Sequence, residues 1–140
     1  MPSSVFSFRP IGIIRTPHTD PARTPRQPIH AVGCTGRVEI FPPFVEGLEE
    51  LENYSRIWLL FVFHQTKEVR LKVIPHGQDH ERGVFTTRAP CRPNGIGMSL
   101  VPLLRREGNF LYVDHVDMLD GTPLLDIKPH SPDLDSGAGL

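Results

Sequence analysis

The stretch IWLLFVF at residues 57–63 decides the fold of this 140-residue chain. It is the longest apolar run in the sequence, and its seven residues are far too few to span a bilayer. Because none of its side chains is polar, the run predicts a central β-strand that is buried on both sides.

Shorter apolar segments flank this run, and several alternate with polar residues in the period of a β-strand. They predict strands near residues 11–14, 38–40, 71–74, 84–87, 98–104, 110–116 and 123–127. Short strands separated by closely spaced turn signals indicate a mostly β protein, folded as a closed barrel or a sandwich. The length fits one domain, which we expect to span residues 1–130, with residues 131–140 as a frayed C-terminal tail.

One helix is expected, at about residues 43–54. The Pro-Pro pair at 42–43 ends the preceding strand and suits a first helical turn. Val45, Leu48 and Leu51 then recur at helical spacing, with glutamates around them.

Charge is unevenly distributed, although the net charge is only −1. Residues 9–37 carry five arginines against one acid, and residues 39–52 carry five acids and no base. Residues 16–35, rich in Pro, Thr and Arg, predict a long ordered loop. The net charge gives no global attraction to nucleic acid, but twelve of the fifteen basic residues are arginine, which favours directed contacts with oxyanions.

Several classes of protein are disfavoured. The chain has neither a GxGxxG motif after a strand nor a GxxxxGK[ST] motif, which argues against dinucleotide-binding and P-loop folds. Cys34 and Cys91 stand far apart and read as reduced thiols of a cytoplasmic protein, and no signal peptide is expected. His76, Asp79 and His80 lie beside Pro and Gly, so we expect a solvated loop there rather than a metal site.

The segment 82–106 holds five arginines and no carboxylate. Prolines and glycines beside the inner arginines shape its backbone, so Arg88 and Arg92 are expected at fixed positions. A planar guanidinium suits bidentate contact with a carboxylate or phosphate, and pairing with acids elsewhere in the chain is the open alternative.

Two further polar groups follow strands. His64 and Gln65 come directly after the apolar run, where they can form the rim of a pocket or simply cap the strand. Asp126, Lys128 and His130 alternate with apolar residues, so a period of two places them on one face of a strand. Three titratable groups on one face are candidates for acid–base chemistry, and a structural Asp–Lys pair is the competing interpretation.

Five motifs together resemble the TsaA-like family, also called TrmO-type. They are IGIIRTPH (11–18), TPRQP (24–28), WLLFVFHQT (58–66), GVFTTRAPCRPNGIGMSLV (83–101) and DGTPLLDIKPH (120–130). The resemblance spans almost the whole chain. It implies a small closed or partly closed β-barrel with one short helix and long ordered loops, a homodimer, and S-adenosylmethionine as methyl donor; we expect no metal.

The resemblance also implies residues for each ligand. The family's cofactor motifs correspond to Gln27, Pro28, Ile29, His64, Gln65, Arg88, Met98, Gly121, Thr122, Pro123 and Leu124. Asp126 and Lys128 match the DIKP segment and are expected to be catalytic, with Asp126 as the base. Arg26, Arg92 and His130 are expected to contact the acceptor. The chain departs from the family pattern at Cys91, Gly95 and His130.

The best-characterised members of this family methylate the exocyclic nitrogen of N6-threonylcarbamoyladenosine, the base beside the tRNA anticodon (position 37). The expected acceptor is therefore tRNA, with Arg88 or Arg92 holding the threonyl carboxylate or an RNA phosphate. Two other functions stay open, namely methylation of a small amino-acid-like acceptor and non-catalytic binding of an adenosine ligand. Longer bacterial members continue into an extra C-terminal domain that can help to hold tRNA.

Overall fold

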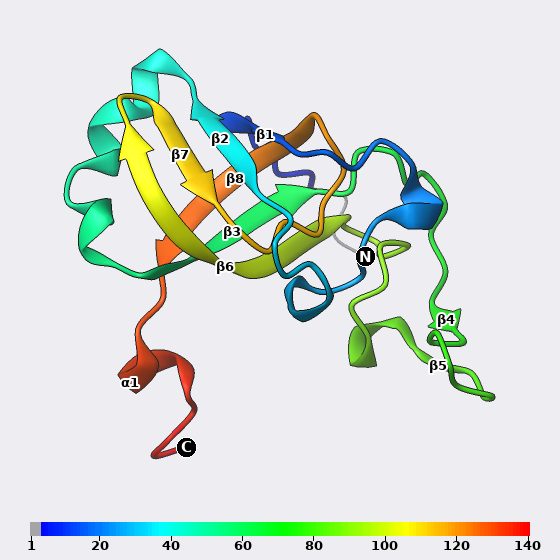
Figure 1. The fold of residues 1–140 in the computed structure, drawn as a ribbon. Coiled ribbons are helices and arrows are strands. Elements are labelled where there is room, and N and C mark those ends of the chain that lie inside the picture. Colours follow the sequence, from blue (N-terminus) through cyan, green and yellow to red (C-terminus); the bar gives the residue numbers. More distant parts are fainter. Residues whose placement is uncertain (1–3) are drawn as a thin grey trace.

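Alternating apolar residues close the chain into a six-stranded barrel in the computed structural model, which describes residues 4–140. The strands are β1 (Gly12–Arg15), β2 (Gly36–Ile40), β3 (Arg56–Val62), β6 (Ile96–Glu107), β7 (Phe110–Val113) and β8 (Thr122–Pro129). Their order is β1-β2-β7-β6-β3-β8, neighbouring strands are antiparallel, and β8 pairs with β1 to close the ring (Figure 1). The mostly β fold predicted from the sequence is confirmed.

Every second side chain of the strands fills the barrel interior. On β3, Ile57, Leu59 and Phe61 are no more than 5% exposed, whereas the intervening Trp58 and Leu60 are only half-buried. The prediction that residues 57–63 are buried on both sides is therefore wrong. The inner face of a barrel strand meets the core, but its outer face meets loops or solvent, so apolar residues there are only partly covered.

The helix predicted at 43–54 is also wrong in type. The segment forms two 3-10 helices, η3 (Pro42–Leu48) and η4 (Leu51–Asn53). Glu50 lies between them with φ of 69°, a left-handed conformation that ends any regular helix. No helix in residues 4–140 is long and apolar enough to cross a bilayer.

The strand predicted at 84–87 is instead a 3-10 helix, η5 (Val84–Thr86). The hydroxyls of Thr86 and Thr87 donate to the carbonyls of Gly83 and Val84, each over 2.7 Å, so local hydrogen bonds replace ladder partners. Next to it, β4 (Lys72–Val73) and β5 (Arg82–Gly83) form a separate two-stranded sheet. Strand β7 ends at Val113, short of the predicted residue 116.

The predicted tail contains the one α-helix of the described chain, α1 (Pro132–Asp135). Asp135 Oδ2 accepts hydrogen bonds from the Ser131 amide over 2.9 Å and from Trp58 Nε1 over 3.1 Å. These bonds lower the pKa of Asp135 and fasten the first residues of the tail to the outer face of β3.

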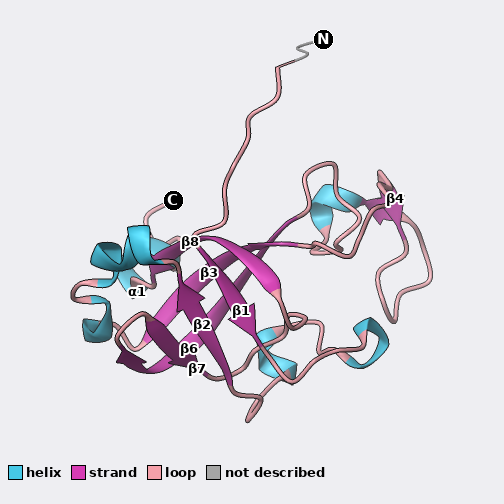
Figure 2. Cartoon of the chain, turned by 90° about the horizontal axis from the view of Figure 1, so that it is seen from above, coloured by secondary structure: helices cyan, strands magenta, loops and turns pink. Residues whose placement is uncertain are grey.

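Three connections between strands leave one end of the barrel, which we call the loop end, whereas residues 41–55 with η3 and η4 lie at the other end. Strands β1, β3 and β7 end at the loop end, and β2, β6 and β8 begin there, because neighbouring strands are antiparallel. The loop end therefore carries residues 16–35, 63–95 and 114–121, including the 3-10 helices η1 (Pro21–Arg23) and η2 (Pro28–His30). Figure 2 shows these connections extending away from the barrel, with β4 at their far edge.

Candidate functional site

The loop end brings together residues that are far apart in the sequence. Arg88 Nη1 donates to Gln27 Oε1 over 3.2 Å, although 61 residues separate the two. Gln27 precedes η2, which packs near β6. The PRQP segment and the arginine-bearing segment predicted as ligand-binding therefore meet at one place.

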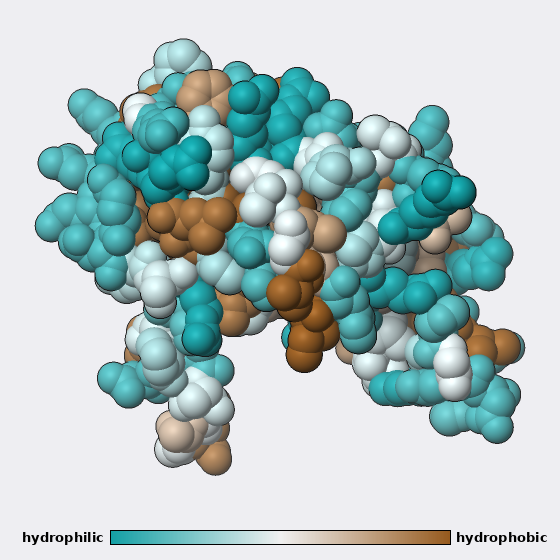
Figure 3. Space-filling model, viewed as in Figure 1, coloured by the Kyte–Doolittle hydropathy of each residue, from teal (hydrophilic) through white to brown (hydrophobic). Residues whose placement is uncertain are grey.

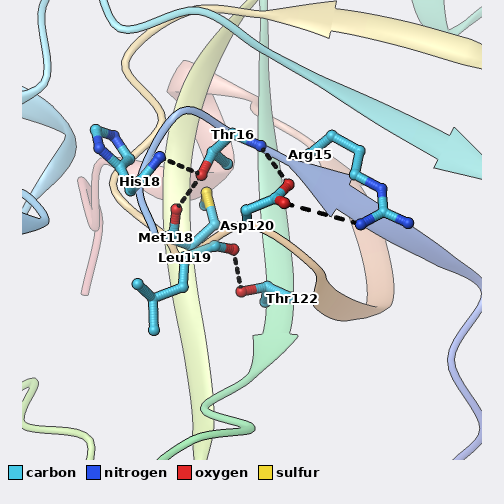
Figure 4. A network of polar contacts seen from close by, with 7 residues as sticks. All are labelled: Arg15, Thr16, His18, Met118, Leu119, Asp120 and Thr122. Atoms are coloured by element: carbon cyan, nitrogen blue, oxygen red, sulfur yellow. Dashed lines mark hydrogen bonds and ion pairs between the residues drawn. The ribbon is translucent and has the colours of Figure 1, made fainter. Parts of the chain in front are cut away.

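A polar network fixes the DGTP turn, which also lies at the loop end (Figure 4). Asp120 Oδ1 accepts from the Thr16 amide over 3.1 Å, and Asp120 Oδ2 lies 3.9 Å from Arg15 Nη1. Thr122 is 2% exposed and donates to the carbonyl of Leu119 over 2.6 Å. Gly121 has φ of 81°, a conformation that glycine adopts without strain. The turn is thus rigid and presents Gly121 and its neighbours at the mouth of the barrel.

The exit of β3 forms a second side of the loop end. The Phe63 amide donates to the carbonyl of Gly95 over 2.9 Å, and His64 and Gln65 follow in a turn. At Gly97 a Cβ atom would overlap the Phe61 ring, so this close packing requires glycine. His64 is half-buried and Gln65 is exposed.

Two outward-facing apolar residues of the predicted site are uncovered. Met98 is 46% exposed on β6, and Ile29 is 74% exposed in η2. Apolar surface beside hydrogen-bonding groups such as Gln27 and Arg88 suits a ligand that has both a flat heterocycle and a charged amino-acid end. The side chains at the loop end therefore offer the apolar and hydrogen-bonding contacts that a molecule like S-adenosylmethionine needs.

Arg92 is engaged in its own loop. Its Nη1 atom donates to the carbonyls of Thr87 and Ala89 over 2.7 and 3.2 Å, and its guanidinium lies 5.9 Å from the centre of the Phe85 ring. It therefore shapes the segment that carries Arg88. Arg26 is exposed, and within residues 4–140 its side chain makes no hydrogen bond or ion pair.

Asp126 and Lys128 lie on the outer face of β8. Leu60 of β3 is opposite Asp126 but Phe61 is opposite Leu124, so Leu125 is the extra residue of a β-bulge. The bulge lets both Leu124 and Ile127 face the core, and it turns Asp126 and Lys128 outward. Lys128 Nζ pairs with Asp126 Oδ2 over 3.0 Å.

Of the predicted acid–base group, Asp126 and Lys128 form an ion pair, and the ring of His130 lies beside Trp58, the residue opposite Lys128. Leu60 of β3 is opposite Met98 of β6 on one side and opposite Asp126 of β8 on the other. At a strand spacing of about 4.8 Å, the backbones of Met98 and Asp126 therefore lie about 10 Å apart. His130 instead follows β8 at the opposite end of the barrel. Its amide donates to the carbonyl of Arg56, and its ring lies 6.3 Å from that of Trp58.

Asp117 is a residue that the sequence did not single out. Its Oδ1 atom accepts from the hydroxyl of Ser99 over 2.7 Å, and Ser99 faces the barrel interior with 2% exposure. Burial raises the pKa of Asp117 to about 6, against the opposing effects of the Ser99 hydrogen bond, His18 and Arg88. Alternation along residues 96–101 could have predicted that Ser99 faces the interior. Its hydrogen bond to Asp117, 18 residues away, could not be predicted, because it depends on the fold.

The predicted solvated loop at 76–80 contains no gathered ligand set. His76, Asp79 and His80 are exposed, and His80 Nδ1 lies 3.2 Å from Asp79 Oδ1. Nowhere in the part of the chain that the structure describes do three or more His, Cys, Asp or Glu residues form a group that could hold a metal ion.

Comparison with known proteins identifies the family of the chain. A protein from Pyrococcus abyssi named probable S-adenosyl-L-methionine-binding protein is 50% identical over 94% of this chain and 71% of its own length. The tRNA (adenine(37)-N6)-methyltransferase of Escherichia coli is 40% identical over 95% of this chain, but the match spans only 61% of that enzyme. The crystal structure of TrmO from Pseudomonas aeruginosa superposes with a TM-score of 0.82 at 44% identity, covering 98% of this chain and 61% of that one. The model of the tRNA-methyltransferase O N-terminal domain matches residues 13–136, and the chain belongs to this family.

Proposed function

We propose that this protein transfers a methyl group from S-adenosylmethionine to the N6 nitrogen of the adenosine at position 37 of tRNA, beside the anticodon. We further propose that this adenosine carries an N6-threonylcarbamoyl group. The observation that carries the proposal is the meeting of Gln27 and Arg88 at the loop end, which also carries the rigid DGTP turn. The names of the relatives support the donor and the reaction class.

The donor would be held by the loop end. When bound, S-adenosylmethionine supplies a methyl group on a positively charged sulfur. Arg88 and Gln27 offer hydrogen-bonding groups for its amino-acid end, and His64, Gln65 and the backbone of the turn at Gly121 complete the wall. Exposed Ile29 and Met98 offer apolar contact for the adenine ring.

Asp126 is proposed to take the proton that the acceptor nitrogen loses when its new bond to carbon forms. The nitrogen is amide-like and weakly nucleophilic, so holding the reactants in line and removing the proton both contribute to the rate. Lys128, paired with Asp126 over 3.0 Å, orients the carboxylate on the outer face of β8. Arg92 and Arg26, on the two loops that carry Arg88 and Gln27, are proposed to bind the threonyl carboxylate or a phosphate.

A homodimer is proposed as well. Ile96 is 43% exposed on the outer face of β6, and a second copy would cover such an apolar side chain. Cys34 and Cys91 are free thiols, which supports a cytoplasmic location. Sedimentation equilibrium would measure the mass, and a monomer at all concentrations would contradict the dimer.

The test of the function uses two tRNAs that differ only in the threonylcarbamoyl group. We expect labelled methyl transfer to the modified tRNA and little to the unmodified one, because a site built for a charged partner rejects the analogue that lacks it. Equal labelling of both would contradict the carboxylate argument. Labelling of neither, with donor binding intact by calorimetry, would favour a small amino-acid-like acceptor, which the net charge of −1 also suits.

A further inference from the structure

Three arginines and one tyrosine form a row across four adjacent strands, on the side of the barrel formed by β1, β2, β7 and β6. Arg15 of β1 is opposite Arg37 of β2, Arg37 is opposite Tyr112 of β7, and Tyr112 is opposite Arg105 of β6. We call these four residues the arginine row. At about 4.8 Å between strands, the row spans about 14 Å.

All four side chains of the arginine row point away from the core. Ile14, Val38, Leu111 and Val113 are fully buried, so alternation places Arg15, Arg37 and Tyr112 on the outer face, and the Arg105 guanidinium lies over the Tyr112 ring. The row lines a groove of about 460 Å³ together with Thr16, Pro17, Thr35, Gly36 and Leu104. In Figure 3, strongly hydrophilic side chains gather over β2 and β7, the strands at the centre of the row.

The positive charge of the row is only partly balanced. Arg105 Nε pairs with Glu107 over 3.0 Å, and Arg15 Nη1 lies 3.9 Å from Asp120. Arg37 forms no ion pair within residues 4–140; its guanidinium instead lies 5.4 Å from the centre of the Phe110 ring. Each pair is more than a third exposed, so solvent leaves much of the donor capacity of these arginines available to a ligand.

The fold itself gains little from this arrangement. Like charges directly opposite each other in a sheet are destabilising, and Arg15 and Arg37 occupy such a pair of positions. A purely structural role would be served better by an acid at one of the two positions. The arrangement makes physical sense when an anionic partner lies across both guanidinium groups.

The row leads to the candidate site. Arg15 pairs with Asp120 of the DGTP turn, and the Gly121 amide donates to the carbonyl of Ile14 over 2.9 Å. One end of the groove therefore lies beside the turn proposed to hold the methyl donor. A polymer bound along the row can reach the loop end without leaving the surface.

We propose that the arginine row binds the phosphate backbone of the tRNA whose adenosine is methylated. This inference rests on the proposed function. Guanidinium groups bind phosphates in a bidentate manner, and a line of them at successive strand positions suits a polymer with regularly spaced anions. Such interactions position the RNA without reading its sequence. Tyr112, whose ring lies 3.9 Å from the Arg105 guanidinium, holds that arginine extended over the groove.

The test compares Arg37→Gln and the double variant Arg37→Gln/Arg105→Gln with wild type, using anisotropy of labelled tRNA at several salt concentrations. Arg56→Gln is the matched control, because Arg56 is an exposed strand arginine outside the groove, at the other end of the barrel. We expect the double variant to bind tRNA at least about tenfold more weakly. The slope of log K against log salt should fall by roughly 0.7–0.9 for each phosphate that the variant no longer neutralises.

Arg37→Lys should keep most of the affinity, because it keeps the charge. Donor affinity, measured by calorimetry, should not change in any of these variants. In steady-state methylation the row variants should raise KM for tRNA with kcat nearly unchanged. A merely structural role would instead lower the melting temperature and would leave the salt slope intact.

The outcomes separate this inference from the proposed function. Row variants that bind tRNA with wild-type affinity and salt slope would overturn the inference alone. Weaker binding by the variants, in a protein that methylates no tRNA, would support the row and contradict the proposed reaction. A wild-type protein that binds no tRNA would overturn both. Competition by polyglutamate as effective as by polyuridylate at equal charge would overturn the assignment to nucleic acid.

Discussion

Arg88 donates a hydrogen bond to Gln27, and this bond joins the long loop at 16–35 to the loop at 63–95. Neither loop belongs to the barrel, yet both are held at the same mouth by proline-containing turns and short 3-10 helices. The guanidinium uses one of its five donors on Gln27, which orients the group and leaves the others for a ligand.

Replacing Arg88 by lysine should weaken donor binding. The charge is kept, but the variant has no planar fork that can bind Gln27 and a carboxylate together, so we expect affinity to fall about tenfold, in line with an interaction of about 1.5 kcal/mol. Titration calorimetry with S-adenosylmethionine measures this directly. Arg56→Lys is the control and should bind the donor like wild type; equal affinities for all three proteins would show that Arg88 does not contact the donor.

Replacing Asp126 by asparagine should reduce turnover far more than donor affinity. Loss of a general base typically costs about 10²–10⁴ in rate. Single-turnover assays, combined with donor titrations, separate the two effects. The control is Asp133→Asn, which changes an exposed acid of α1. Normal turnover in Asp126→Asn would leave only a structural pair with Lys128, and loss of donor binding would make the assigned role wrong.

The Asp117 carboxyl should make the protein less stable as pH rises. Its pKa is about 6 in the folded state against an ordinary value of 3.8, so between these values the folded chain binds more protons than the unfolded chain. The stabilisation is complete below about pH 3.8 and is lost as pH rises through about 6. At roughly 1.4 kcal/mol per pKa unit, the loss is about 3 kcal/mol.

Denaturant unfolding of wild type and Asp117→Asn at pH 4 to 8 measures this contribution. The difference in free energy of unfolding between the two proteins should shift in favour of the variant as the pH rises. A difference that stays constant over this range would show that Asp117 titrates with an ordinary pKa.

Replacing Gly97 by alanine should destabilise the barrel by about 1–3 kcal/mol, because the new Cβ would overlap the Phe61 ring. Gly95→Ala is the matched control, since its Cβ would meet Phe63 at an ordinary 3.6 Å. Thermal and denaturant unfolding of both variants measure the effect. Equal stabilities would mean that the Phe61 ring moves aside at little cost.

The barrel strands could be predicted because each follows a local pattern. Alternation of inward apolar and outward polar residues marks β2 and β8, and the run at 57–63 marks β3. The helix at 43–54 could not be predicted correctly, because a spacing that suits an α-helix also suits two 3-10 turns. The break at Glu50 depends on a backbone conformation that the residue type does not indicate.

The candidate site was predictable as motifs but not as a geometry. His64 and Arg88 were singled out from local sequence and Gly121 by the family resemblance, and the strand directions place all three at the loop end. The Asp117–Ser99 hydrogen bond and the arginine row were not visible, because each requires the relative positions of segments that are distant in sequence. A one-residue irregularity such as the bulge at Leu125 leaves no clear mark in a short strand.

Because Leu125 is the extra residue of the bulge, its deletion would leave every other side chain of β8 on the face of the sheet that it occupies now. Without it, Leu124 would join Asp126 directly, and inward and outward positions would alternate in unbroken pairing with β3. Deleting Ile127 instead would bring Lys128 to an inward position, where a charged side chain would meet the apolar core. Related chains can therefore differ in length at Leu125 and still present the carboxylate on the outer face, whereas a change in length after Asp126 would damage the core.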